Sequence, residues 1–232
     1  MKTYVVHWKQ APERRQHIAA HFPDLDLEFI DKYDKSDVTG GASKTMEVFP
    51  EMRRWFKDEV FYSNNHVCNA CVAMSHIESI MKFAESGEKQ CIIIEDDAVK
   101  IYPDFKHKLN MYIDELQSLA PDWDILCIND AKAGSDIRRL LAGCCGTQFI
   151  KMLEMRQTAA YLVSAPGAKK ILEILDNKNG LGLYENSCLD NWLSRLLLAG
   201  APVNCWWTIA PLIINGNKMG KFKRTYNYSV KE

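Results

Sequence analysis

The feature that most constrains the fold is the stretch C-I-I-I-E-D-D-A-V-K-I-Y from Cys91 to Tyr102. A short run of apolar residues rich in isoleucine is typical of a strand that helices cover on both faces, as in a parallel α/β sheet. Three adjacent carboxylates, Glu95, Asp96 and Asp97, end the run, because each is costly to remove from water without a counter-charge. We therefore expect them at the carboxyl end of a strand, the edge where open α/β sheets bind ligands.

The three acids permit two interpretations, an ordinary solvated acidic turn or a site for a divalent cation. Side chains of an extended chain alternate, so Glu95 and Asp97 should point the same way and Asp96 the other way. Two carboxylates separated by one residue can share a hard cation such as Mg²⁺ or Mn²⁺. The residues alone leave both interpretations open.

The composition is that of an ordinary globular protein. With 232 residues, of which 47% are hydrophobic and 25% charged, the chain can bury one large core, and we expect a single domain over residues 1–232. The formal net charge of -1 gives no general attraction to nucleic acid. Because the amino-terminal apolar run is too short for a signal peptide and no later run reaches membrane-spanning length, we expect a cytoplasmic protein without a transmembrane segment, possible contact with a membrane surface aside.

The eight cysteines do not predict a disulfide scaffold. Cys91 and Cys127 fall in expected buried strands, so the cysteines are interpreted as reduced, mostly buried thiols. Cys68 and Cys71 have the C-x-x-C spacing of a zinc or redox pair, but no second pair or histidine follows at a finger-like distance.

Apolar segments alternate with helix-start and turn signals along the chain, which predicts alternating strands and helices. Strands are expected at residues 3–8, 25–30, 91–94, 123–128, 149–155, 158–164, 203–207 and 212–214. Helices are expected at residues 12–21, 50–60, 68–85, 103–116, 137–141, 166–175 and 191–198. The basic tail with Lys221, Lys223 and Arg224 is interpreted either as a lid over a diphosphate or as a solvated end.

Several polar residues are expected near the edge of the sheet where open α/β sheets bind ligands. Arg14 follows the first strand, and its guanidinium suits phosphate oxygens, although a solvated helix face would explain it equally well. Asp31, at the end of the second strand, is either a ribose acceptor or a turn former. Ser75 and His76 lie on the helix at 68–85, as residues that support a pocket or as packing residues.

Five segments, in their order and spacing, resemble glycosyltransferase family 25, the family of lipooligosaccharide and collagen galactosyltransferases. They are Y-V-V-H-W-K-Q-A-P-E-R-R near the amino terminus, N-A-C-V-A-M-S-H at 69–76, I-I-I-E-D-D-A-V at 92–99, T-A-A-Y-L-V-S-A-P-G-A-K-K at 158–170 and C-L-D-N-W-L at 188–193. The chain departs from the family where His7 and Trp8 replace a usual Asn, and where Ala159 and Ala160 replace usual glycines.

The resemblance implies an α/β fold of GT-A type, with a nucleotide-binding, mostly parallel sheet flanked by helices. It implies an inverting, metal-dependent hexosyltransferase that moves galactose or glucose from a UDP-sugar to a hydroxyl of a glycan, glycoprotein or glycolipid acceptor. It assigns Mn²⁺ or Mg²⁺ to Asp97 and Glu95. Residues expected at the donor site are His7, Trp8, Arg14, Asp31, Ser75, His76, Glu95 and Asp96.

Asp190 is the candidate general base. An inverting transfer needs a carboxylate across the sugar from the departing diphosphate, so it cannot be one of the metal's acids. Asp190 is far in sequence from the acidic triplet and starts an expected helix, where a role as N-cap is the rival explanation. The resemblance of C-L-D-N-W-L to the family's late aspartate motif favours the base.

Two other functions compete with sugar transfer. A module that keeps the fold but has lost turnover would bind donor or glycan without forming product. A metal-dependent phosphohydrolase would release phosphate without an acceptor, but it needs further ligand clusters, which the sequence does not contain.

Overall fold

The protein is described by a computed structural model that covers residues 1–39, 41–56, 64–130, 141–145, 148–152, 155, 158–177, 189–217 and 219–222. Its strands are β1 (Lys2–Val6), β2 (Asp26–Ile30), β3 (Gln90–Glu95), β4 (Ala98–Lys100), β5 (Ile125–Cys127), β6 (Leu141–Cys145), β7 (Phe149–Met152), β8 (Ala160–Ser164), β9 (Cys205–Thr208) and β10 (Ile213–Asn215). Its α-helices are α1 (Pro12–His21), α2 (Thr45–Val48), α3 (Asn64–Ser86), α4 (Phe105–Leu119), α6 (Ala165–Asn177) and α7 (Leu189–Leu198). Short 3-10 helices are η1 (Lys35–Asp37), η2 (Ala42–Lys44) and η3 (Pro50–Arg54).

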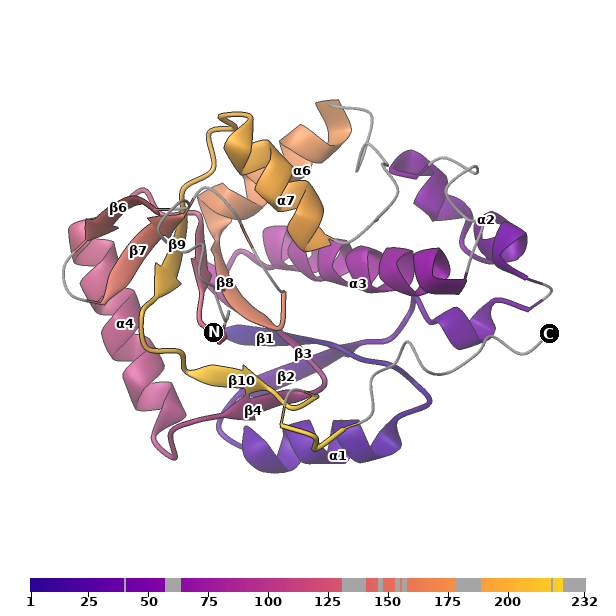
Figure 1. Cartoon of the computed structure of the whole chain (residues 1–232), viewed down its shortest axis with the longest axis horizontal. Helices are drawn as coiled ribbons and strands as arrows, with labels where there is room; N and C mark the ends of the chain where they lie inside the picture. Colours follow the sequence, from indigo (N-terminus) through magenta and orange to yellow (C-terminus); the bar gives the residue numbers. More distant parts are fainter. Residues whose placement is uncertain are drawn as a thin grey trace.

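A mixed eight-stranded sheet forms the centre of the described residues, in the order β2-β1-β3-β8-β5-β9-β7-β6. β1 is parallel to β2 and β3, and β5 is parallel to β9. β8 runs antiparallel to β3 and β5, and β7 runs antiparallel to β9 and β6. Since only β8 and β7 oppose the common direction, the predicted mostly parallel sheet flanked by helices is confirmed (Figure 1).

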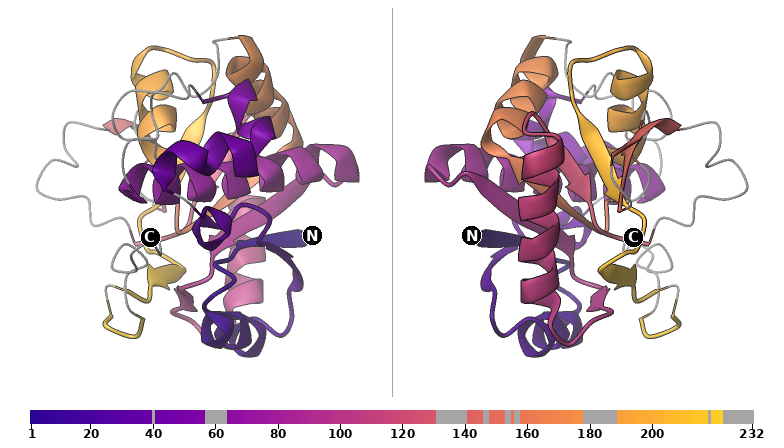
Figure 2. Two further views of the ribbon diagram at one scale, coloured as in Figure 1. Left: turned by 90° about the vertical axis from the view of Figure 1, so that its right-hand side faces the viewer. Right: turned by 90° about the vertical axis from the view of Figure 1, so that its left-hand side faces the viewer.

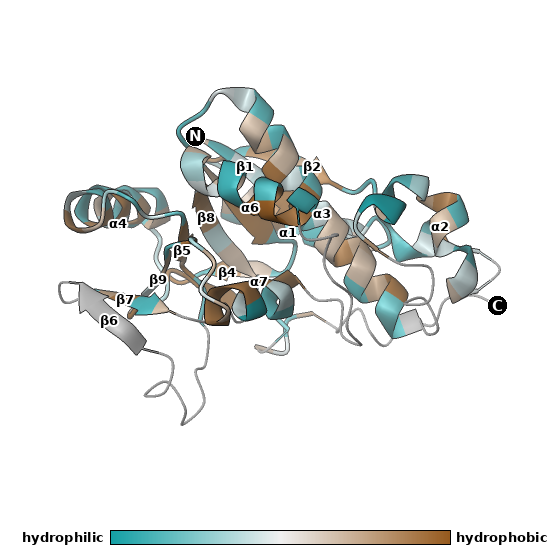
Figure 3. Cartoon of the chain, turned by 90° about the horizontal axis from the view of Figure 1, so that it is seen from above, coloured by the Kyte–Doolittle hydropathy of each residue, from teal (hydrophilic) through white to brown (hydrophobic). Residues whose placement is uncertain are grey.

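Each strand in the middle of the sheet is buried on both faces, as the isoleucine run predicts. Cys91 and Ile93 of β3 pack into one core cluster, while Ile92 and Ile94 pack into the other. The same alternation places Tyr161 and Leu162 of β8 on opposite faces. β5 and β8 are accordingly drawn in hydrophobic colours in Figure 3.

Two groups of helices cover the sheet. α3, α6 and α7 pack on one face, with residues such as Ile77, Ile171 and Leu193 in the first core cluster. α1 and α4 pack on the other face through Ile18 and Leu109. α4 and α2 lie at opposite ends of the long axis of the molecule (Figures 1 and 2). Because β1 and β3 are parallel neighbours, their carboxyl ends lie at the same edge of the sheet.

A second, two-stranded sheet brings the carboxyl-terminal part of the chain to the acidic triplet. β10 pairs antiparallel with β4, which follows Asp97 directly. Gly216 N then donates to the Asp97 carbonyl at 2.8 Å. A Cβ at Gly216 would stand 2.7 Å from that carbonyl oxygen, so only glycine permits this approach.

Some predicted boundaries differ from the structure. Where a helix is expected at 50–60, the described residues form the five-residue 3-10 helix Pro50–Arg54, which begins at a proline. Its hydrogen bonds join residues three positions apart, and helices of this type are usually short. Residues 137–140 of the expected helix at 137–141, and Lys223 and Arg224 of the possible lid, lie outside the described residues, while residue 141 begins the strand β6. Within the described residues, we find no helix with the length and apolar character needed to cross a membrane.

Candidate functional site

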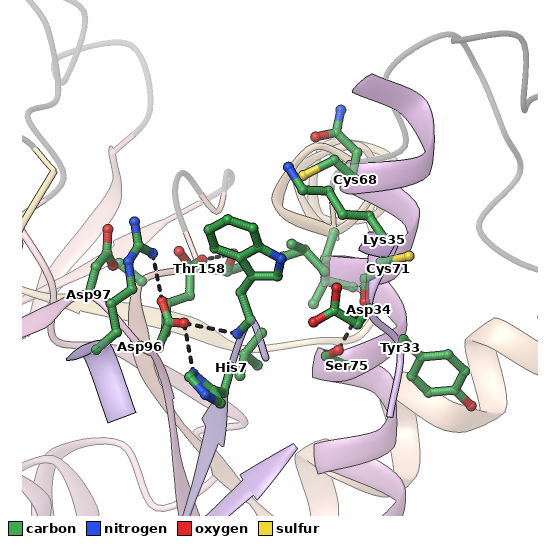
Figure 4. A pocket seen from close by; sticks show the side chains of 18 of the residues that line it. His7, Tyr33, Asp34, Lys35, Cys68, Cys71, Ser75, Asp96, Asp97 and Thr158 are labelled. Atoms are coloured by element: carbon green, nitrogen blue, oxygen red, sulfur yellow. Dashed lines mark hydrogen bonds and ion pairs between the residues drawn. The ribbon is translucent and has the colours of Figure 1, made fainter. Parts of the chain in front are cut away.

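A cavity of about 310 Å³ opens at the carboxyl ends of β1 and β3 (Figure 4). Its walls contain most of the residues that the sequence indicates as a site. The predicted residues that line it are His7, Trp8, Arg14, Ser75, Glu95, Asp96, Asp97 and Asp190. The structure therefore brings residues 7 and 190 to one cavity, although Asp31 and His76 are not among the lining residues.

Asp96 lines the cavity and contacts three neighbouring polar groups. Arg14 Nη1 donates to Asp96 Oδ1 at 2.8 Å, while Trp8 N donates to Oδ2 at 2.9 Å and His7 Nδ1 lies 3.0 Å from the same oxygen. The side chains of Arg14, His7 and Asp96 are all buried. Because both oxygens of Asp96 are engaged, this carboxylate ties α1 and the end of β1 to the acidic turn.

Glu95 and Asp97 are held differently from Asp96. Thr158 Oγ1 donates to Glu95 Oε1 at 2.9 Å, and the Glu95 side chain keeps 26% of its exposure. Asp97 is 1% exposed, and Asn217 Nδ2 donates to its Oδ2. Asp97 Oδ1 is buried and has no hydrogen-bond donor within the described part of the chain. The solvated acidic turn is therefore not what forms, because Asp97 is buried rather than exposed to water.

The environment of Asp97 suits a bound cation. Burial, then the nearby charges of Glu95 and Asp96, raise the pKa of Asp97 to about 7. The raised pKa means that the charged form of Asp97 is destabilised in this environment. A cation at Oδ1, which has no hydrogen-bond partner among the described residues, would stabilise the charged form. Among the described residues, no group of three or more His, Cys, Asp or Glu side chains could hold a metal alone. Mg²⁺ in proteins commonly uses one or two carboxylates together with substrate phosphates and water, so Glu95 and Asp97 fit such an ion.

The carboxyl-terminal segment supplies amides that the sequence analysis did not identify. Asn215 and Asn217 line the cavity. Asn217 bridges two charged groups, since its Nδ2 donates to Asp97 while its Oδ1 accepts from Arg14 Nη2 at 3.4 Å. No local signal in I-N-G-N marks this role, because it depends on the pairing of β10 with β4.

The residues that follow β2 form another wall of the cavity that the sequence analysis did not identify. Tyr33, Asp34 and Lys35 line the cavity. Asp34 Oδ1 accepts from Ser36 N at 2.8 Å, and its Oδ2 accepts from Lys9 N at 2.7 Å, so this acid shapes the turn. Lys35 is buried and its Nζ lies 5.2 Å from the centroid of the Trp8 ring. The D-K-S sequence is a recognisable Asx-turn signal that could have indicated this loop.

α3 contributes thiols and a hydroxyl to the cavity. Cys68, Cys71 and Ser75 line it, and Ser75 Oγ donates to the Cys71 carbonyl at 3.0 Å. Both cysteines are free thiols, and they are buried, as are Cys91, Cys127 and Cys205. Burial raises the pKa of the Cys71 thiol well above its usual range, which makes it a weak nucleophile.

Asp31 and His76 do not line the cavity, and the buried position of His76 is compatible with either of its two interpretations, as a support of the pocket or as a packing residue. Asp31 Oδ2 accepts from Arg15 Nη1 at 3.4 Å between exposed side chains, three residues before the turn that reaches the cavity. His76 is fully buried behind the cavity wall, with Nδ1 3.0 Å from Tyr161 Oη and Nε2 3.6 Å from Glu95 Oε1. His76 thus lies next to Glu95, a residue of the cavity wall.

Asp190 lines the cavity from α7, the helix on the same face of the sheet as α3. α7 begins at Leu189, so Asp190 stands within the first turn of the helix and not before it. Asn191 N donates to Asp190 Oδ1 at 2.8 Å, and the side chain is partly exposed. Its carboxylate is thus accessible from the cavity that Glu95 and Asp97 also line.

Comparison with known proteins gives a family match. A family model described as glycosyltransferase family 25 (LPS biosynthesis protein) matches residues 1–188. A curated relative from Aedes aegypti, described as a glycosyltransferase 25 family member, is 22% identical over 172 residues, which are 73% of this chain and 27% of the relative. The chain therefore spans about a quarter of that relative's length. The family match contains the acidic triplet but ends before Asp190 and α7.

Solved structures show more distant likenesses. Apo UDP-glucose pyrophosphorylase is 8% identical, with a TM-score of 0.47 and 90% of each chain covered. The galactosyltransferase LgtC, solved with donor and acceptor sugar analogues, is 10% identical, with a TM-score of 0.40 over 88% of this chain and 73% of that one. Mouse xyloside xylosyltransferase 1 is 9% identical, with a TM-score of 0.37 over 85% of this chain and 67% of that one.

Proposed function

The chain belongs to glycosyltransferase family 25, and from that premise we propose that it transfers a hexose from a UDP-sugar to a hydroxyl of a glycan or glycosylated acceptor. We propose an inverting mechanism, in which the acceptor oxygen displaces the diphosphate in a single in-line step. Such a reaction needs stabilisation of the leaving group and, on the opposite side of the sugar, a proton acceptor.

The observation that carries the proposal is that Glu95, Asp97 and Asp190 line one cavity although two separate elements supply them. Glu95 and Asp97, at the end of β3, would bind the cation that stabilises the leaving group. Asp190 of α7 would accept the proton. A pocket that only bound a nucleotide would not need a second, separate carboxylate.

Glu95 and Asp97 would hold Mn²⁺ or Mg²⁺, with donor phosphates and water completing the coordination. A divalent cation at this place would neutralise charge that develops on the departing diphosphate. Asp96 stays the buried counter-ion of Arg14 and takes no part in coordination, since both its oxygens already accept hydrogen bonds.

The remaining walls would bind the donor. Trp8, at the end of β1, presents an aromatic ring in the cavity, and Lys35 beside it is a buried cation. We assign the ring to contacts with the base or sugar and the ammonium to phosphate oxygens. Asp190 would accept the proton of the acceptor hydroxyl.

A donor screen tests the function. Thermal shift and product formation are measured with a panel of nucleotide sugars, in Mn²⁺ and in chelator, with and without glycan acceptors. We expect stabilisation by UDP and a UDP-hexose that depends on Mn²⁺, and transfer only when an acceptor is present. Phosphate release without an acceptor would indicate a hydrolase, and binding without any product would indicate a binding module.

A further inference from the structure

A buried pair of side chains stands directly behind Glu95. His76 of α3 is 0% exposed and Tyr161 of β8 is 1% exposed, and neither lines the cavity. Tyr161 Oη lies 3.0 Å from His76 Nδ1. The other ring nitrogen, His76 Nε2, lies 3.6 Å from Glu95 Oε1 and has no hydrogen-bond partner within the described residues. The three groups thus form a line from the core to the cavity wall.

The chemistry of these groups distinguishes between the two tautomers of the neutral ring. If Nδ1 carried the proton, the lone pair of Nε2 would face the carboxylate oxygen of Glu95, and the hydroxyl proton of Tyr161 would have no acceptor among the described residues. If Nε2 carries the proton, Tyr161 donates to Nδ1 and the Nε2–H group faces Glu95. The second arrangement gives the Tyr161 hydroxyl an acceptor and directs the Nε2–H group toward Glu95 Oε1, which at 3.6 Å lies just beyond hydrogen-bond distance.

We propose that His76 is a positioning residue, held by the Tyr161 hydroxyl in the tautomer whose Nε2–H group orients the Glu95 carboxylate toward the cation and donor. The inference rests on the proposed function of Glu95 as a ligand. Thr158 already donates to Glu95 Oε1, so His76 would provide a second donor to the same oxygen. The other oxygen of Glu95 is thereby left to the cavity.

Two substitutions at one position separate this role from simple packing. The amide of His76→Gln reaches about as far as Nε2 and can still donate to Glu95. The amide of His76→Asn reaches only as far as Nδ1, so it keeps the Tyr161 contact and loses Glu95. We expect Mn²⁺ affinity, measured by titration without any substrate, to fall about tenfold in His76→Asn and to change little in His76→Gln.

The tautomer is tested in the metal-free protein by nitrogen NMR at pH 8, where the His76 signals are assigned by their loss in His76→Asn. We expect the proton on Nε2, and a shift of that signal in Glu95→Ala but not in the exposed control Asp104→Ala. A proton on Nδ1, or equal Mn²⁺ losses in the two His76 variants, would overturn the proposal. If the parent binds no Mn²⁺ the proposed metal role of Glu95 fails, while the NMR result still decides how His76 is held.

Discussion

Arg14 donates to Asp96 across 2.8 Å inside the protein, although 82 positions separate the two residues in the chain. Their side chains are 5% and 6% exposed. The pair therefore joins α1 to the turn that carries the candidate ligands, and both its charges are removed from water.

Removing one partner of this pair should unfold the protein more easily. We expect Arg14→Met to lower the free energy of unfolding by about 3–5 kcal/mol, because it leaves the Asp96 charge buried and partly uncompensated. Urea denaturation measures this. The neighbouring Arg15→Met is the matched control, since Arg15 pairs with Asp31 at the surface, and should cost less than about 1 kcal/mol. Equal losses in the two variants would contradict a buried role for Arg14.

The stability of the metal-free protein should fall as the pH rises toward 8. The pKa of Asp97 is about 7 in the folded protein and about 3.9 when unfolded. Its contribution is therefore fully present below about pH 3.9 and is lost as the pH rises through 7. Relative to Asp97→Asn, which cannot titrate, the parent should lose about 2 kcal/mol between pH 5.5 and pH 8.

Thermal or urea unfolding in chelator measures this difference, with the exposed Asp104→Asn as control. Mn²⁺ added at pH 8 should restore the stability of the parent and leave Asp97→Asn unchanged. A parent and variant with parallel pH profiles would show that Asp97 is not the group that titrates.

Asp190→Asn should abolish transfer and spare binding. The amide cannot accept the acceptor's proton, so we expect turnover to fall by about 10²–10⁴. Affinities for UDP and Mn²⁺ should stay within about twofold of the parent. Glu173→Gln, an exposed change on α6, serves as control. Transfer near the parent rate in Asp190→Asn would mean that another group accepts the proton.

Gly216→Ala should disturb the acidic turn from the far end of the chain. Its Cβ would come within 2.7 Å of the Asp97 carbonyl oxygen and 2.8 Å of the Phe222 ring. The backbone contact cannot relax without moving β10 away from β4, so we expect a loss of about 1–3 kcal/mol and weaker Mn²⁺ binding. The exposed Met219→Ala should do neither. An unchanged Mn²⁺ affinity in Gly216→Ala would show that the carboxyl-terminal segment does not influence cation binding at the acidic turn.

The sequence predicts those parts of the structure that depend on neighbouring residues. The isoleucines of β3 alternate between two cores as their pattern requires, and the acids stop the strand where apolar burial ends. The insertion of β8 between β3 and β5 could not be read from local pattern, because pairing partners depend on the path of the whole chain. The same reason explains why Asn217 was missed.

Of the two acids that follow β2, we expected Asp31 at the site, whereas Asp34 is the one that lines the cavity. Asp31 and Asp34 have the same chemistry and follow the same strand, so residue type alone does not separate them. The difference between them is the Asx turn at Asp34, which places the next residue, Lys35, beside Trp8 in the cavity. Loop geometry of this kind is determined by a few hydrogen bonds and not by hydrophobic period.

The position of β8 also has a consequence for synthesis of the chain. β3 leaves the ribosome about 65 residues before β8, so until then one edge of an apolar strand of the sheet's centre has no partner. A nascent chain that pauses in this interval would offer that edge to other chains. Translation speed between the two strands, and the chaperones that bind at this length, should therefore govern how much of the protein escapes aggregation.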